Sequence, residues 1–176
     1  MGATVALGGQ RSKGRDALSQ AEQWVLLAYR LPRVPSTPRS SVWRKLKRLG
    51  VAQFGDGLVA LPADARTREQ LDWIAEEVTD HGGEAMIWLG RPVDETAEAA
   101  IIERMTASVT AEYDAVAAEA ASMLDSDSPA RTRTAARLRR ELQRIRARDY
   151  FQTASQDRAR RAVEELTARS TVKVRL

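Results

Sequence analysis

Residues 31–62 read LPRVPSTPRSSVWRKLKRLGVAQFGDGLVALP, and this stretch decides the fold that we expect. Pro32, Pro35 and Pro38 predict an extended loop, because each proline fixes its own φ and biases the preceding residue away from helix. Ser36 and Thr37 are candidate N-caps of a helix that ends near Leu49, just before Gly50. Two short apolar runs then flank an Asp-Gly pair, which predicts a β-hairpin.

The flanking segments extend this pattern in both directions. Residues 23–31 (QWVLLAYRL) form an apolar run typical of a buried strand, and residues 84–89 (EAMIWL) predict another. Between the hairpin and that last strand, Thr67 is the expected cap of a second helix. The apolar stripe of this helix is Leu71, Ile74, Ala75 and Val78.

The resulting order is β-α-β-β-α-β across residues 23–90, which is the order of a ferredoxin-like domain. Its two helices should cover one face of a four-stranded antiparallel sheet. The four tryptophans fall in the first strand, both helices and the last strand, so we expect them to share the core. They are Trp24, Trp43, Trp73 and Trp88.

After residue 92 the pattern becomes helical. Apolar residues recur every three or four positions over residues 95–124, and a break at residues 125–129 separates this helix from two more, at residues 130–149 and 154–169. Residues 171–175 alternate like a short strand. We therefore expect an α+β protein with a disordered basic tail over residues 1–21, a ferredoxin-like domain over residues 22–92, and an arginine-rich helical hairpin or bundle with a short final strand over residues 93–176.

Charge is distributed unevenly, although the net charge is only +4. Residues 1–55 hold 10 Lys/Arg and 2 Asp/Glu, residues 56–127 hold 4 and 17, and residues 128–176 hold 14 and 5. Two interpretations follow. The basic segments form a surface for an anionic partner, or they pair with the acidic helix through residues such as Glu103, Glu112 and Glu119.

Two basic helices supply the candidate binding residues, because clustered guanidinium and ammonium groups suit phosphates or oxyanions. On the second helix, Arg133, Arg137, Arg140 and Arg144 lie on one stripe. The candidates for DNA or anion binding are Arg30, Arg33, Arg39, Arg44, Lys45, Lys47, Arg48, Arg137, Arg140 and Arg144.

Composition argues against several classes of site. The chain has no cysteine and one histidine, which excludes thiol chemistry and a multi-histidine metal site within one chain. A metal-dependent nuclease on this fold typically has an acidic residue at the end of the first strand, where this chain reads Ala28-Tyr29-Arg30. No run reaches the length of a membrane span or a signal-peptide core. We expect a cytoplasmic, non-enzymatic homodimer without metal or cofactor.

The central stretch resembles the N-terminal domain of the chromate resistance protein family ChrB. The resemblance covers residues 22–92 and is most specific over residues 31–62. Its matching positions are Leu31, Pro32, Ser36, Arg39, Trp43, Arg44, Leu46, Lys47, Gly50, Asp56, Gly57, Leu61 and Pro62.

The resemblance implies a transcriptional regulator that binds operator DNA of a chromate-efflux operon and releases it when chromate is present. It also implies a fold related to the ferredoxin-like domains of PaaX-type regulators and of small CRISPR-associated nucleases. Longer members of the family carry a second, C-terminal domain. Two alternatives remain open: a module that senses an oxyanion such as chromate or sulfate or docks on a partner protein, and, ranked lower, a metal-dependent nuclease.

Overall fold

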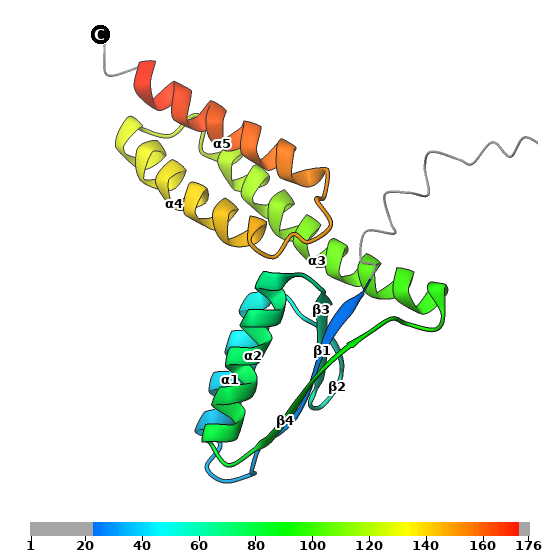
Figure 1. The fold of residues 1–176 in the computed structure, drawn as a ribbon. Helices are drawn as coiled ribbons and strands as arrows, with labels where there is room; N and C mark the ends of the chain where they lie inside the picture. Colours follow the sequence, from blue (N-terminus) through cyan, green and yellow to red (C-terminus); the bar gives the residue numbers. More distant parts are fainter. Residues whose placement is uncertain (1–22, 173–176) are drawn as a thin grey trace, which may run out of the picture.

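A computed structural model describes residues 23–172 of the chain, so the tail expected over residues 1–21 lies outside the described residues. The first part is a four-stranded antiparallel sheet with strand order β2-β3-β1-β4. Two helices, α1 and α2, lie side by side on one face of this sheet (Figure 1). The elements are β1 (Trp24–Arg30), α1 (Thr37–Leu49), β2 (Ala52–Gly55), β3 (Leu58–Pro62), α2 (Ala65–Asp80) and β4 (Glu84–Gly90). The predicted α+β class and ferredoxin-like order are confirmed.

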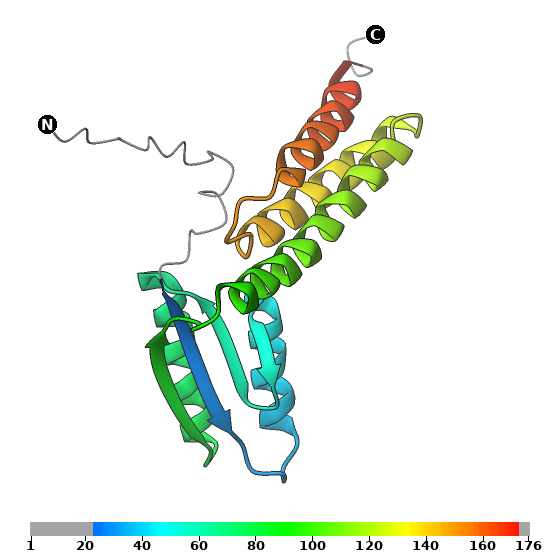
Figure 2. The same cartoon turned by 90° about the vertical axis from the view of Figure 1, so that its right-hand side faces the viewer.

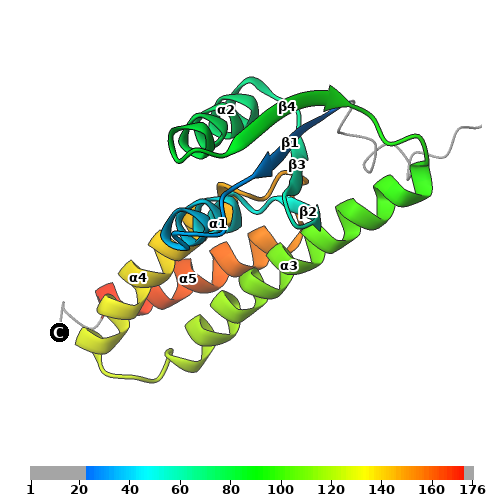
Figure 3. The same ribbon diagram turned by 90° about the horizontal axis from the view of Figure 1, so that it is seen from below.

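Three helices follow the sheet: α3 (Glu95–Ser122), α4 (Ser128–Arg146) and α5 (Ser155–Val172). They form a bundle that projects beyond one end of the sheet (Figure 2). α4 and α5 pack along α3, which runs the length of the bundle (Figure 3). Asp127 caps α4 by accepting a 2.7 Å hydrogen bond from the backbone N–H of Ala130, which explains why a new helix begins after the predicted break.

Apolar periodicity accounts for two buried clusters. Val25 and Leu27 of β1 and the stripe of α2 lie in the sheet core, together with Ile101, Ile102 and Met105 of α3. Farther along α3, Val109, Tyr113, Val116 and Ala120 lie in the bundle core. A single continuous helix therefore contributes to both cores.

The expectation that all four tryptophans share the core is wrong. Trp24 is buried and Trp43 is partly buried, but Trp73 is 69% exposed and Trp88 is 57% exposed. Trp73 lies beside, not on, the buried stripe of α2. Trp88 is opposite Leu26 in the β1–β4 register, and both lie on the sheet face that α1 and α2 leave uncovered.

Two local predictions are also corrected. The N-cap of α2 is Asp64, whose carboxylate accepts a 2.6 Å bond from the N–H of Thr67, while the Thr67 hydroxyl accepts a 3.0 Å bond from the N–H of Asp64. Thr67 thus belongs to the third helical position. Thr171 and Val172, predicted to begin a strand, are the last residues of α5, and the remainder of that prediction lies outside the described residues.

None of the helices in residues 23–172 combines the length and the apolar character that a membrane-spanning helix needs.

A basic groove and an adjoining cavity as the candidate site

Helix α1 buries one side and presents cations on the other. Val42 and Leu46 are fully buried against the sheet, because positions four apart share a helix face. Arg44, Lys47 and Arg48 are exposed. The helix ends at Gly50, which has φ +70° and whose N–H bonds to the carbonyl of Lys47. The cations at this end of α1 therefore lie close to the bundle.

A groove of about 790 Å³ lies between this end of α1 and the C-terminal end of α4. No acidic residue is among the described residues that line it. The lining residues are Ser41, Arg44, Lys47, Arg48, Arg144, Ala147 and Arg148. We call this feature the basic groove. Five cationic side chains from segments about 100 positions apart in the sequence thus meet at one surface.

Hydrogen bonds from side chains to backbone carbonyls join the sheet domain to the segment at the end of α4, beside the basic groove. The Tyr150 hydroxyl donates a 2.8 Å hydrogen bond to the carbonyl of Leu49, and the Arg66 guanidinium donates a 2.6 Å bond to the carbonyl of Ala147. A Cβ at Gly50 would lie 3.2 Å from the Cβ of Arg148, so the absence of a side chain permits this close approach. Burial raises the pKa of Tyr150 to about 12, so its hydroxyl stays protonated and continues to donate at alkaline pH, up to about pH 12.

Arg148 lies at the edge of the basic groove and forms an ion pair with Glu112 of α3. The sequence-based candidates did not include it, because its position depends on how α4 packs against α1. The aromatic pair Tyr150-Phe151, directly after the arginine-rich helix, is the sequence signal that could have marked this docking point: Phe151 packs beside Trp24 with ring centroids 6.4 Å apart.

The structure brings together only part of the predicted set. Arg44, Lys47, Arg48 and Arg144 line the basic groove. Arg30, Arg33 and Arg39 lie at the other end of the sheet, where the Arg39 guanidinium donates a 3.4 Å bond to the carbonyl of Arg33. Arg140 is exposed on α4, away from the groove lining.

Other predicted cations are engaged in ion pairs. Lys45 lies 2.6 Å from a carboxylate oxygen of Glu77, and Arg137 pairs with both Glu119 and Glu141. Glu119 also raises the pKa of Arg137, chiefly by accepting its hydrogen bond. The pairing interpretation of the uneven charge therefore holds for some cations, while Arg44, Lys47, Arg48 and Arg144 line a groove to which no described acidic residue contributes.

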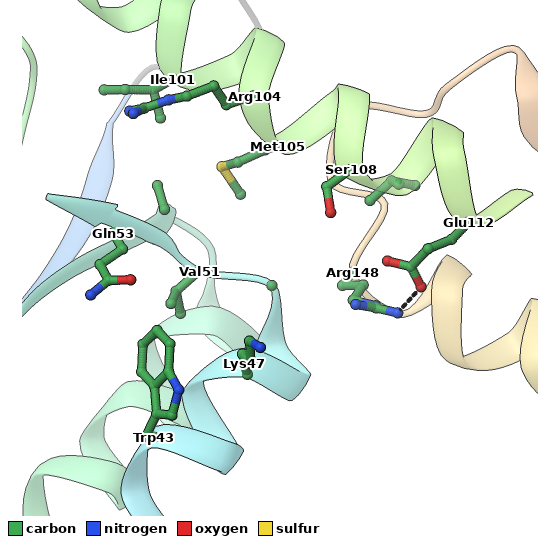
Figure 4. A pocket seen from close by; sticks show the side chains of 13 residues that line it. Trp43, Lys47, Val51, Gln53, Ile101, Arg104, Met105, Ser108, Glu112 and Arg148 are labelled. Atoms are coloured by element: carbon green, nitrogen blue, oxygen red, sulfur yellow. Dashed lines mark hydrogen bonds and ion pairs between the residues drawn. The ribbon is translucent and has the colours of Figure 1, made fainter. Parts of the chain in front are cut away.

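A second cavity, of about 610 Å³, adjoins the basic groove (Figure 4). It lies between the end of α1, strand β2 and the first half of α3. Its lining is mixed: apolar residues form one part, while Lys47, Arg104 and Arg148 supply cations and Glu112 supplies a carboxylate. Lys47 and Arg148 line both this cavity and the basic groove. We call it the junction cavity.

Within residues 23–172, no group of three or more His, Asp and Glu side chains is arranged to hold a metal ion. His81 is exposed at the C-terminus of α2 and lines neither the basic groove nor the junction cavity.

These features define an α+β protein in which a ferredoxin-like domain carries a three-helix bundle and the two parts meet at a basic groove. The family model "Protein ChrB, N-terminal" matches residues 39–126, half of the chain, and the chain belongs to this family. It is 32% identical over 140 residues to "Protein ChrB" of Cupriavidus metallidurans strain CH34, a match that covers 77% of this chain and 43% of that protein. The chain thus spans less than half of this curated relative. No solved structure matches it.

Proposed function

We propose that the chain is a DNA-binding transcriptional regulator associated with chromate resistance, the biological setting to which its family is linked. In this proposal it acts in the cytoplasm, as a homodimer, by binding and not by catalysis. The observation that carries the proposal is the basic groove, where five cations line one surface with no acidic neighbour among the lining residues.

The composition of the basic groove suits a phosphate backbone. Guanidinium groups donate forked, charge-assisted hydrogen bonds to phosphate oxygens, and each neutralised phosphate releases condensed counterions. Arg44 and Arg48 on α1 and Arg144 on α4 approach from two sides, as expected for a surface that follows a polyanion. Such contacts provide affinity and orientation, while sequence choice requires contacts to base edges.

The homodimer in this proposal is supported by the uncovered face of the sheet. Strand β4 is an edge strand, and its Met86 and Trp88, two positions apart on the same face, are each more than half exposed. Large apolar side chains gathered on one surface favour association with another protein surface. A two-fold dimer would carry two basic grooves, one in each protomer.

Fluorescence anisotropy with duplex DNA from upstream of the chain's own gene tests the proposal at two salt concentrations. We expect Arg44→Ala and Arg48→Ala each to weaken binding and to reduce the log–log salt slope by roughly 1, because one phosphate contact is lost. Arg137→Ala, a surface arginine already paired with Glu119 and Glu141, is the matched control and should change neither. Binding that is insensitive to salt, or equally weakened by all three changes, contradicts the proposal.

A second candidate is the sensing of an oxyanion. It is favoured by the presence of Arg48, Arg144 and Arg148 in the lining of one groove, because guanidinium groups suit a dianion such as chromate or sulfate. Equilibrium dialysis with chromate should then show saturable binding that sulfate displaces. Arg48→Ala should abolish it, while Arg39→Ala, at the other end of α1, should not. Equal loss in both variants would argue against this site.

A further inference from the structure

The junction cavity has a chemistry that the basic groove does not share. We propose that it binds an organic anion with a flat apolar body, of the class of aryl carboxylates and aryl sulfonates, and that this ligand competes with DNA for two shared cations. The first part stands on the cavity alone, while the second rests on the proposed DNA-binding function.

One side of the junction cavity is apolar and firmly held. Ile101 and Met105 of α3 lie across it from Val51 (Figure 4), and Val109 and Ala52 also line it. The α3 residues are each at least nine-tenths buried, so the core fixes their positions. The side chain of Met105 points into the space between the two walls, and a thioether adapts well to an aromatic surface. Trp43 of α1, half-buried, adds an aromatic wall.

The margin of the cavity is cationic. Lys47 and Arg148 lie on the side toward the bundle, and Arg104 lies near Ile101 (Figure 4). Glu112 supplies one carboxylate, which the ion pair with Arg148 already engages. Gln53 and Ser108 add neutral hydrogen-bonding groups. An apolar floor with an excess of cations around it selects a ligand that carries both an apolar body and a negative group.

The volume and the location agree with this class of ligand. About 610 Å³ is within the range of small-molecule sites, and such sites form preferentially where two structural units meet. A bare oxyanion would leave the apolar floor unused. A neutral aromatic compound would leave the cations unsatisfied.

The shared cations couple the cavity to the basic groove. Lys47 and Arg148 line both, so when either side chain binds an anion in the junction cavity, it is less available to a DNA phosphate. Coupling between two ligands is reciprocal, so bound DNA should lower the affinity for the organic anion by the same factor.

Methyl NMR of methionine-labelled protein, with anilinonaphthalene sulfonate as the probe, tests the site directly. Met105 reports on the junction cavity, while Met86 reports on the uncovered apolar face of the sheet. We expect the probe to shift the Met105 signal at lower concentration than the Met86 signal. Phenylnaphthylamine, which lacks the sulfonate, and inorganic sulfate, which lacks the apolar body, should each shift it about tenfold less effectively. Perturbation of Met86 alone would overturn the proposal.

Two pairs of variants locate the probe further. Ser108→Phe places an aromatic side chain in the cavity from an exposed helix position and should block the probe, whereas Ala107→Phe, exposed on the same helix and outside the lining, should not. Arg104→Ala should weaken the probe but leave DNA affinity unchanged, since Arg104 lines only the junction cavity. Arg161→Ala, an exposed arginine of α5, is its control. Equal probe affinity in Ser108→Phe and Ala107→Phe would overturn the site.

The two parts fail independently. If no DNA binds under any condition, the proposed function fails, while the NMR result still decides the cavity. If DNA binds and the probe occupies the cavity without weakening DNA, the shared-cation coupling is wrong and the ligand site stands.

Discussion

Two tyrosines show how single side chains in this molecule depend on their surroundings. Tyr113 is fully buried in the bundle core, and its hydroxyl lies near Asp149 without a hydrogen bond of regular geometry to a described residue. Tyr150 joins the bundle to α1 through its bond to the Leu49 carbonyl. Burial raises the pKa of each to about 12; the charge of Asp149 adds to the effect at Tyr113.

These shifts predict a loss of stability at high pH. An unfolded tyrosine loses its proton near pH 10, whereas each of these tyrosines in the folded protein keeps it to about pH 12. The contribution of the two raised pKa values to the free energy of unfolding is therefore complete below pH 10 and falls between pH 10 and 12. The limiting slope is about 1.4 kcal/mol per pH unit for each tyrosine. Denaturant titrations at several pH values should show a shallower alkaline decline in Tyr113→Phe and Tyr150→Phe than in the parent protein.

Near neutral pH the same two variants should differ in their free energy of unfolding. Tyr113→Phe removes a buried hydroxyl that lacks a hydrogen bond of regular geometry to a described residue, so the free energy of unfolding should stay constant or rise slightly. Tyr150→Phe leaves the Leu49 carbonyl without its partner and should cost about 1 kcal/mol. An alkaline decline as steep as that of the parent in both variants would show that other groups control it.

At the scale of secondary-structure elements, two glycines with positive φ differ in their surroundings. A side chain at Gly57 would meet both backbone strain and a steric clash, whereas one at Gly82 would meet backbone strain alone. Gly57, in the β2–β3 turn, has φ +95°, and a Cβ there would lie 2.3 Å from the carbonyl oxygen of Tyr29. Gly82, between α2 and β4, has φ +72°, and nothing lies within 4 Å of its Cβ position.

We expect Gly82→Ala to cost about 1 kcal/mol, the penalty of a left-handed conformation for a residue with a Cβ. Gly57→Ala should cost substantially more, because the hairpin must move away from β1 and lose the 2.7 Å bond from the Tyr29 N–H to the Gly57 carbonyl. Thermal denaturation of both variants measures the difference. Equal costs would mean that the turn shifts freely and that β1 does not hold it.

The elements themselves were largely predictable, because local patterns specify them. The apolar run at residues 23–31 yields β1 at Trp24–Arg30, and Gly50 ends α1 as expected. The position of a side chain within the whole fold was harder to predict from the sequence. Trp88 is a residue type common in cores, but it lies on a part of the sheet face that α1 and α2 do not cover, and no local sequence pattern indicates this.

The candidate site shows the same limit. The cations of α1 and Arg144 were predictable from helical spacing, since residues three or four apart share a face. Arg148 was not, because its place beside Gly50 arises from a contact between segments about 100 positions apart. The ion pairs could not be predicted for the same reason, because Arg137 pairs with Glu119 only where α4 packs against α3.

On the scale of the whole molecule, α3 links the two cores. Its first turns supply Ile101, Ile102 and Met105 to the sheet core, and the rest of the helix supplies Tyr113 and Val116 to the bundle core. Trp24 donates a 2.7 Å hydrogen bond to Glu98 near the start of the helix, and Phe151 packs beside the same tryptophan. Unfolding either part alone would therefore expose apolar surface of the other.

This continuity predicts one cooperative unfolding transition, and two probes can test it separately. All four tryptophans lie between residues 24 and 88, so their fluorescence follows the sheet domain, while far-UV circular dichroism is dominated by the long helices of the bundle. In the parent protein the two denaturation curves should coincide. Phe151→Ala should remove about 2 kcal/mol from the contact between the bundle and Trp24 and make the curves separate, because only the first turns of α3 and polar contacts such as the Tyr150–Leu49 bond then join the parts within the described residues. Val93→Ala, at a fully exposed position outside both cores, should leave them coincident. Separate curves in the parent protein would mean that α3 unfolds between its two core segments, and that the basic groove is assembled from parts that open independently.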